Sequence, residues 1–231
     1  MTTTFAGAGR YSGNGAQGKN RIDGFVSFPG GKFDDLQVDG VCTSEGDLEA
    51  NTIKIDGVFK AKGNVKANSI DCDGVVTIEG NLRAGRVDVD GTVSIKGDKV
   101  EADYIMCDGV LSAENQVSAD LIEANGFINA KEIVGDKIVI KSFKRSRIAH
   151  FIWKAKEAFT NADYSRIDLI EATTIELRGV KAKTVSGHDV IIGPACIIDR
   201  VDCSGILKID ATATVGEVMG NATAQPQEST E

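Results

Sequence analysis

Six aspartates stand at nearly constant intervals, and each is followed by a glycine. Asn125-Gly126 continues the series with steps of 16, 17, 17, 17, 18 and 17 residues, after Asp-Gly pairs at Asp23, Asp39, Asp56, Asp73, Asp90 and Asp108. A row of carboxylates could bind calcium, as in repeated β-rolls, but the Gly-Gly-x-Gly-x-Asp spacing of those repeats is absent. Asp-Gly is also a common turn in which the carboxylate accepts backbone N–H bonds. We therefore expect turns at these positions and no bound metal.

The other residues that could do chemistry are two histidines and five cysteines. Neither His150 nor His188 has a nucleophile and carboxylate beside it in a catalytic arrangement. The segment Ile192-Gly-Pro-Ala-Cys-Ile197 resembles one unit of a hexapeptide-repeat acyltransferase, in which His188 would be the candidate catalytic histidine. That fold needs the unit many times over, and it occurs once here. With no phosphate-binding glycine loop either, the sequence predicts no enzyme activity, no cofactor and no small-molecule substrate.

The cysteines match no metal site or disulfide framework. No CxxC pair is present, and the spacings fit no zinc module. Cys72 and Cys107 occupy a repeat position that holds Val38, Ile55 and Val89 elsewhere, so we interpret them as small core residues. The full set is Cys42, Cys72, Cys107, Cys196 and Cys203. Free thiols are typical of a reducing cytoplasm.

The fixed period predicts a solenoid in which each repeat forms one coil. Short runs with alternating apolar and polar residues indicate β-strands. Each coil offers three corners: Asp-Gly, then Gly followed by Asn or Asp, then a polar residue or glycine after an alanine, as at Gly63-Asn64 and Ala67-Asn68. Gly, Asn and Asp tolerate the left-handed backbone of sharp corners. We expect a triangular parallel β-helix of 17-residue coils; the alternative is a meander or barrel of hairpins with Asp-Gly turns.

A charged column supports this stacking. The position five residues after each corner glycine alternates in sign in sequence order, reading Glu45, Lys62, Glu79, Lys96, Glu114 and Lys131. Stacked coils would place these side chains next to one another, where opposite charges attract. The column therefore predicts that these six coils stack in the order of the chain.

Composition narrows the function. Net charge is −8, which argues against nucleic-acid binding. Aromatic residues make up only 6% of the chain, as a narrow prism requires. The sequence shows neither a signal peptide nor a membrane-spanning apolar run. We expect a cytoplasmic protein, with the inner face of the cell membrane as a site of peripheral attachment.

The chain divides into five parts. Residues 1–18 are rich in Gly, Ser, Thr and Ala and predict a flexible leader, and residues 19–140 form the regular coils. Residues 141–166 interrupt the pattern, residues 167–216 resume it in degenerate form, and residues 217–231 predict a disordered tail.

The interruption has the composition of a basic amphipathic helix. Six Lys or Arg and no acid lie between Lys141 and Lys156, and apolar residues recur at helical spacing at Ile148, Phe151, Ile152, Ala155 and Phe159. Such a helix could lie in a membrane interface or contact a partner, or it could pack its apolar face on the solenoid. The candidate membrane or partner contacts are Lys144, Arg145, Arg147, Phe151, Trp153 and Lys154.

The coils resemble those of bactofilins, the polymer-forming cytoskeletal proteins of bacteria. The resemblance lies in the repeated Asp-Gly and Gly-Asn corners over residues 20–215. In addition, the segment Ile170-Glu-Ala-Thr-Thr-Ile-Glu-Leu-Arg-Gly-Val-Lys-Ala-Lys-Thr-Val185, with Val190-Ile-Ile-Gly-Pro-Ala-Cys196, is similar to longer bactofilin-like proteins of Gram-positive bacteria. The resemblance to bactofilins implies a right-handed β-helix, nucleotide-independent filaments and a scaffolding role near the membrane or cell wall. The basic interruption departs from the short form of the family.

A β-helix without caps leaves open ends that could join. Unpaired backbone groups over an exposed core form an edge that favours pairing with another copy. We therefore expect a scaffold that polymerises end to end, with itself as main partner and cell-envelope proteins as further candidates. The predicted interface residues are Phe25, Val26, Phe28, Phe33, Ile206, Leu207 and Ile209. The alternative is a membrane-associated adaptor that binds partners without polymerising.

Overall fold

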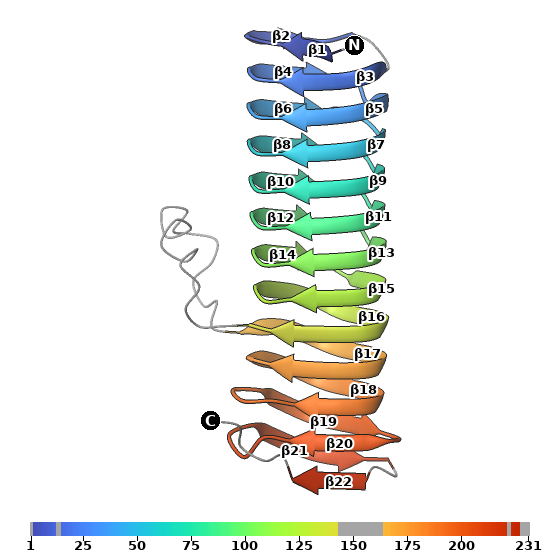
Figure 1. Ribbon diagram of the computed structural model, residues 1–231, viewed down its shortest axis with the longest axis vertical. Helices are drawn as coiled ribbons and strands as arrows, with labels where there is room; N and C mark the ends of the chain where they lie inside the picture. The colour runs from blue at the N-terminus through green and yellow to red at the C-terminus, as the bar shows by residue number, and fades with distance from the viewer. Residues whose placement is uncertain (1, 13–14, 143–163, 221–222, 227–231) are drawn as a thin grey trace.

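The computed structural model describes residues 2–12, 15–142, 164–220 and 223–226. These residues contain strands and no helix, and the strands stack in parallel along one long axis with β1 and β22 at opposite ends of the stack (Figure 1). The stack has about 11 turns. The predicted all-β parallel β-helix is confirmed, whereas the helical or irregular interruption falls, for residues 143–163, outside the described residues.

Each regular coil contains one long and one short strand. The long strands are β3 (Gly15–Ile22), β5 (Gly31–Val38), β7 (Leu48–Ile55), β9 (Val65–Cys72), β11 (Leu82–Val89), β13 (Lys99–Cys107) and β15 (Gln116–Ala124). The short strands are β4 (Phe25–Phe28), β6 (Val41–Ser44), β8 (Val58–Ala61), β10 (Val75–Ile78), β12 (Thr92–Ile95) and β14 (Val110–Ala113). The first coil contributes β1 (Thr2–Phe5) and β2 (Ala8–Arg10).

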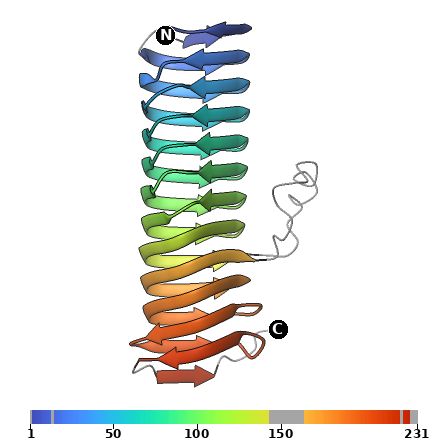
Figure 2. The same ribbon diagram turned by 180° about the vertical axis from the view of Figure 1, so that it is seen from behind.

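The later coils use longer strands. Figure 2 shows the same stack from behind, where the orange and red coils are less regular than the blue and green ones. Their strands are β16 (Phe127–Lys141), β17 (Ser165–Arg178), β18 (Val180–Ile192), β19 (Ile197–Cys203), β20 (Ile206–Ile209), β21 (Thr214–Met219) and β22 (Thr223–Pro226).

Three sides arise because each long strand bends once. In β7, inward and outward residues alternate up to Ala50, after which Asn51 and Thr52 both face outward. The pairing of β7 with β9 correspondingly skips Asn51 and Asn68. Together with the corners on either side of β8, this bend divides the coil into three short sides, as the sequence predicts.

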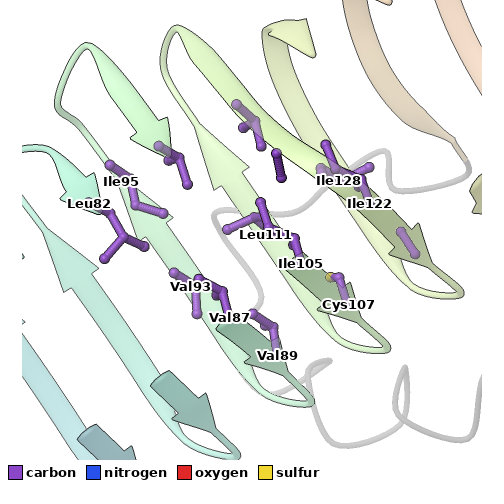
Figure 3. Close-up of a cluster of buried hydrophobic side chains, with 14 of the residues drawn as sticks. Leu82, Val87, Val89, Val93, Ile95, Ile105, Cys107, Leu111, Ile122 and Ile128 are labelled. Atoms are coloured by element: carbon purple, nitrogen blue, oxygen red, sulfur yellow. The ribbon is translucent and has the colours of Figure 1, made fainter. Parts of the chain in front are cut away.

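The core is a set of stacked aliphatic columns. Figure 3 shows Val87, Val89, Ile105 and Cys107 pointing into the interior between successive coils. All five cysteines are buried and free, which confirms the interpretation of Cys72 and Cys107 as core residues. Burial raises the pKa of Cys42, Cys72 and Cys107 to about 12, so these thiols stay protonated at neutral pH.

The Asp-Gly corners need glycine for a different reason from the predicted one. Gly74 does not adopt the left-handed backbone. A Cβ atom there would lie 2.0 Å from the carbonyl oxygen of Gly57 in the preceding coil. Gly57, Gly91, Gly109 and Gly126 show the same close approach. The glycine column exists because neighbouring corners pack backbone against backbone.

The charged column stacks as predicted over its first four members. Lys62 forms an ion pair with Glu45. The pKa of Glu79 is lowered by a hydrogen bond from Lys60 and by the charges of Lys96 and Lys62. At its far end the column slips: Lys131 bonds to Asn115 at 2.7 Å instead of reaching Glu114. The register changes there from Val110↔Phe127 to Gln116↔Glu132, a coil one residue shorter.

Both termini add coils that the composition did not predict. Strands β1 and β2 lie within the predicted flexible leader and pair with β3 and β4. The predicted disordered tail contains the end of β21 and all of β22, which pairs with β20. Parallel strands pair through backbone N–H and C=O groups, and every residue except proline carries both. A segment of small or polar residues can therefore add a strand to an existing sheet.

Candidate functional site

The predicted N-terminal interface residues lie one coil inside the stack. Strand β2 covers β4, with Ala8 opposite Phe25. Val26, Phe28 and Phe33 are therefore buried in the core, whereas Phe25 is 66% exposed on the side of the solenoid. The prediction that these residues form the end is wrong, because the leader supplies another coil above them.

The predicted C-terminal interface residues are displaced from the end in the same way. Ile206, Leu207 and Ile209 form β20, and β22 pairs with this strand from below. Leu207 is buried and Ile209 half-buried, while Ile206 is exposed. Strand β22 comes from the segment predicted as a disordered tail, which is why the sequence placed the end too early.

An aromatic pair closes the described N-terminal end. Phe5 and Tyr11 meet edge to face with ring centroids 5.0 Å apart and pack on the first core residues. Among the described strands, β1 pairs only with β3 and β2 only with β4. Each thus keeps one ladder edge open at this end.

The C-terminal end is also open within the described residues. There β21 pairs with β19, and β22 pairs with β20. Val218 and Met219 in β21 are 50% and 39% exposed. The ends therefore combine unpaired backbone with apolar side chains, a combination that favours association.

An outward apolar column runs down the side formed by the short strands. We call it the short-strand stripe; it consists of Phe25, Val41, Val58, Val75, Thr92, Val110 and Phe127, which pair successively in register. Val58 and Val75 are 44% and 46% exposed, whereas Val110 is 8% exposed. Sequence reasoning missed this stripe, although the residue after each corner glycine was its signal.

An acidic ridge flanks the stripe at the Asp-Gly corner. The ridge comprises Asp71, Asp73, Asp88, Asp90 and Asp108. The pKa of Asp90 is raised by partial burial and by the charges of Asp108 and Asp73. The described residues contain no cluster of three or more His, Cys, Asp or Glu side chains arranged to hold a metal ion.

Bonds from side-chain oxygens to backbone N–H groups were predicted for the first corner, Asp-Gly. They are found at the second corner, where Gly is followed by Asn or Asp. There Asp47 Oδ1 accepts the backbone N–H of Asn64 at 2.7 Å, and Asn64 Oδ1 accepts that of Asn81 at 2.9 Å. At the first corner the backbone makes the link to the preceding coil, with the amides of Asp56 and Gly57 both donating to the Val38 carbonyl. The second-corner side chains form a ladder that links each coil to the next.

Two buried serines join the ends of the interruption. Ser142 Oγ donates to the Gly126 carbonyl at 3.0 Å and lies 2.6 Å from Ser165 Oγ. Ser165 Oγ in turn accepts the Ile128 N–H at 3.0 Å. The stack therefore continues across the interruption, since β16 and β17 pair with each other and share one core.

The predicted membrane or partner contacts at Lys144, Arg145, Arg147, Phe151, Trp153 and Lys154 lie outside the described residues, as does His150. His188 Nδ1 is 3.0 Å from Ser204 Oγ. It lines a shallow polar hollow of about 430 Å³ with Glu171 and Asp202. In the described part of the chain, no helix has the length and apolar character needed to cross a membrane.

Comparisons with known proteins add one partial match. The chain is 52% identical over 48 residues to the uncharacterized protein YhbE of Bacillus subtilis (strain 168), a stretch that covers 21% of this chain and 20% of YhbE. The chain thus matches about a fifth of the length of that curated relative. No family model matches the chain, and no solved structure matches it.

Proposed function

We propose that this protein is a structural scaffold of the bactofilin kind, which assembles end to end into filaments without a nucleotide. The observation that carries the proposal is the pair of open ends. Strands β1, β2, β21 and β22 each keep an unpaired edge within the described residues, over a core that runs the length of the stack. A second copy placed at either end would continue the same parallel ladders.

The scaffold acts through geometry, without chemistry at a single site. Each join would pair backbone N–H and C=O groups and bury apolar side chains such as Phe5 and Val218. The corner ladders and charged column would continue along the sides of the polymer. We place this polymer in the cytoplasm, with candidate contacts to the membrane or cell envelope through the interruption.

The test uses a matched pair of phenylalanines. Phe5 packs at the N-terminal end, whereas Phe25 is exposed on the side. Purified protein without nucleotide should form filaments in negative stain and pellet on ultracentrifugation. Phe5→Glu should abolish pelleting while Phe25→Glu should retain it. Pelleting of both variants at the level of the parent protein would rule out joins through this end.

A second variant distinguishes the two ways of joining. If one end binds the opposite end of the next copy, both Phe5→Glu and Val218→Glu give monomers. If like ends bind each other, each variant retains one competent end and gives dimers. Analytical ultracentrifugation separates the two outcomes. A parent protein that stays monomeric at every concentration and floats with anionic liposomes would instead support the adaptor.

A further inference from the structure

The first and the last described strands lie on the same side of the stack, at its opposite ends (Figure 1). We call it the second side; it is formed by the part of each long strand that follows the bend. It begins with β1, which pairs with residues 19–22 of β3. It ends with β20, which pairs with the last part of β18, and then with β22. Pairs in register connect these two ends through every coil between them.

The other two sides each carry one strand fewer. The short-strand side begins with β2 and ends with the first part of β21. The remaining side begins with Gly15 and Ala16 of β3 and ends with the last part of β21. The described chain therefore starts and finishes on the second side, which holds both β1 and β22.

This extra strand sets a condition on joining the end of one copy to the beginning of the next. In such a head-to-tail join, β21 of one copy would lie against β2 and the start of β3 of the other, about 4.8 Å away. On the second side this leaves a single strand position between β20 of the first copy and β3 of the second. In the separate copies that position is filled by β22 and by β1, respectively. A continuous ladder has room for only one of them.

The position of Phe5 favours β1 as the strand that stays. Phe5 lies opposite Ile22 in an inward column that ends in β20 with Ile209. It packs on the core, and its carbonyl accepts the N–H of Asp23 at 3.1 Å. Ile209 is half-buried and also packs on the core. A join with β1 in the shared position would bring Phe5 and Ile209 together and bury more apolar surface.

The sequence of β22 makes it the strand that leaves. Its four residues are Thr-Ala-Gln-Pro, and Pro226 lies opposite Ile209. Proline has no N–H to donate to a neighbouring strand. Among the described strands, β22 pairs with β20 alone. Its departure therefore breaks one ladder at the end of the stack, where local opening costs least.

We infer that β22 is a removable strand that covers the docking edge of β20, and that β1 of a second copy takes its place when copies join head to tail. The inference rests on the proposed end-to-end assembly and names the partner of one edge. In the join β21 keeps its place, and β22 competes with the incoming strand. The register pairs across the join are Thr2 with Ile206, Thr3 with Leu207, Thr4 with Lys208 and Phe5 with Ile209.

A disulfide tests whether β22 has to leave. Lys208 and Gln225 are register partners in β20 and β22, at a strand spacing that suits a disulfide. Oxidised Lys208→Cys/Gln225→Cys protein should stay monomeric on ultracentrifugation, and a reductant should restore filaments. The control Arg200→Cys/Glu217→Cys fixes β21 to β19 at the same end and should form filaments in both states. The native cysteines are all buried and do not compete for the new thiols.

The oxidised Lys208→Cys/Gln225→Cys protein also separates this inference from the proposed function. Filaments at the level of the parent protein would overturn the inference, because β22 would then stay in place. Dimers would overturn it too, since like ends would then join and β1 would not meet β20. In both cases filaments of the parent protein leave end-to-end assembly standing. A parent protein that forms no filaments would overturn the inference together with the proposed function.

Single cysteines identify the strand that lies beside β1 in the join. Thr4 of one copy lies opposite Lys208 of the next if β1 replaces β22, and opposite Gln225 if β22 remains. Thr4→Cys protein mixed with Lys208→Cys protein should form a disulfide between copies on mild oxidation, identified by mass spectrometry of the linked peptides. Thr4→Cys mixed with Gln225→Cys is the matched control and should not. Linkage to Gln225→Cys in place of Lys208→Cys would overturn the inference.

Discussion

The regular coils and the C-terminal coils solve the same problem in different ways. In the regular coils, a glycine corner separates a short strand from a long strand that bends once, and the backbones of adjacent corners touch. In β16, β17 and β18 the strand also runs through a second corner, and it bends there where two successive residues face outward, as at Asp168 and Leu169. Both regions keep the inward aliphatic columns.

The comparison shows which features the fold requires. The spacing of inward residues is common to both regions, so the core defines the coil. Glycine corners and the second-corner ladder occur in the regular coils, where they make successive coils nearly identical. In β18, by contrast, the pairing step shortens, with Ile170 opposite Val185. Bent strands therefore tolerate changes in coil length.

The largest expected effect is at a glycine corner. In Gly74→Ala the new Cβ would meet the Gly57 carbonyl oxygen at 2.0 Å and the Asp56 carbonyl at 2.9 Å, both in the backbone of the preceding coil. We expect a loss of about 3 kcal/mol in the free energy of unfolding, measured by urea denaturation. Thr173→Ala, at an exposed bend of β17, should change stability by less than about 0.5 kcal/mol. Equal effects would show that the two corner types do not differ.

The next effect concerns the junction between the two regions. Ser165→Ala removes the acceptor of the buried Ile128 N–H and the partner of Ser142. An unsatisfied buried donor costs about 1–3 kcal/mol. Hydrogen exchange should show faster opening around Ile128. The control is Ser94→Ala on a half-buried outward position of β12, and comparable exchange in both variants would contradict this role.

A smaller effect is expected in the second-corner ladder. Asn64→Ala removes the acceptor of the Asn81 N–H and a donor to Asp47. We expect a loss of about 1 kcal/mol in thermal or urea unfolding. Asn68→Ala removes only a side-chain bond to Asn51 and should cost less. A larger loss in Asn68→Ala would refute the ladder as a specific link between coils.

The smallest effect depends on pH. The pKa of Glu79 is lowered, first by the hydrogen bond from Lys60. A carboxyl with a lower pKa in the folded state stabilises the fold above its unfolded pKa of about 4.3 and loses that contribution as pH falls through the folded value. Glu79→Gln should therefore lower the thermal midpoint slightly at neutral pH, with the difference vanishing in acid. Glu114→Gln, whose column neighbour Lys131 bonds elsewhere, is the control.

The period made the fold predictable, and the same argument explains where prediction failed. Asp-Gly and Gly-Asn spacing located the coils and inward residues because the core repeats with the corners. The end coils escaped prediction because the segments Thr2–Arg10 and Thr223–Pro226 join by backbone pairing and carry few apolar side chains. The serine pair escaped because Ser142 and Ser165 meet only once the interruption is closed. The stripe could have been found by reading the residue after each corner glycine.

Fibre diffraction from aligned filaments tests the central claim most directly. If copies join end to end, the coil axis lies along the filament, and the strand spacing of about 4.8 Å appears as a meridional reflection. Phe25→Glu filaments should give the same pattern, and Phe5→Glu should give no filaments. A reflection of about 4.8 Å on the equator would mean that copies associate through their sides, and it would contradict the account.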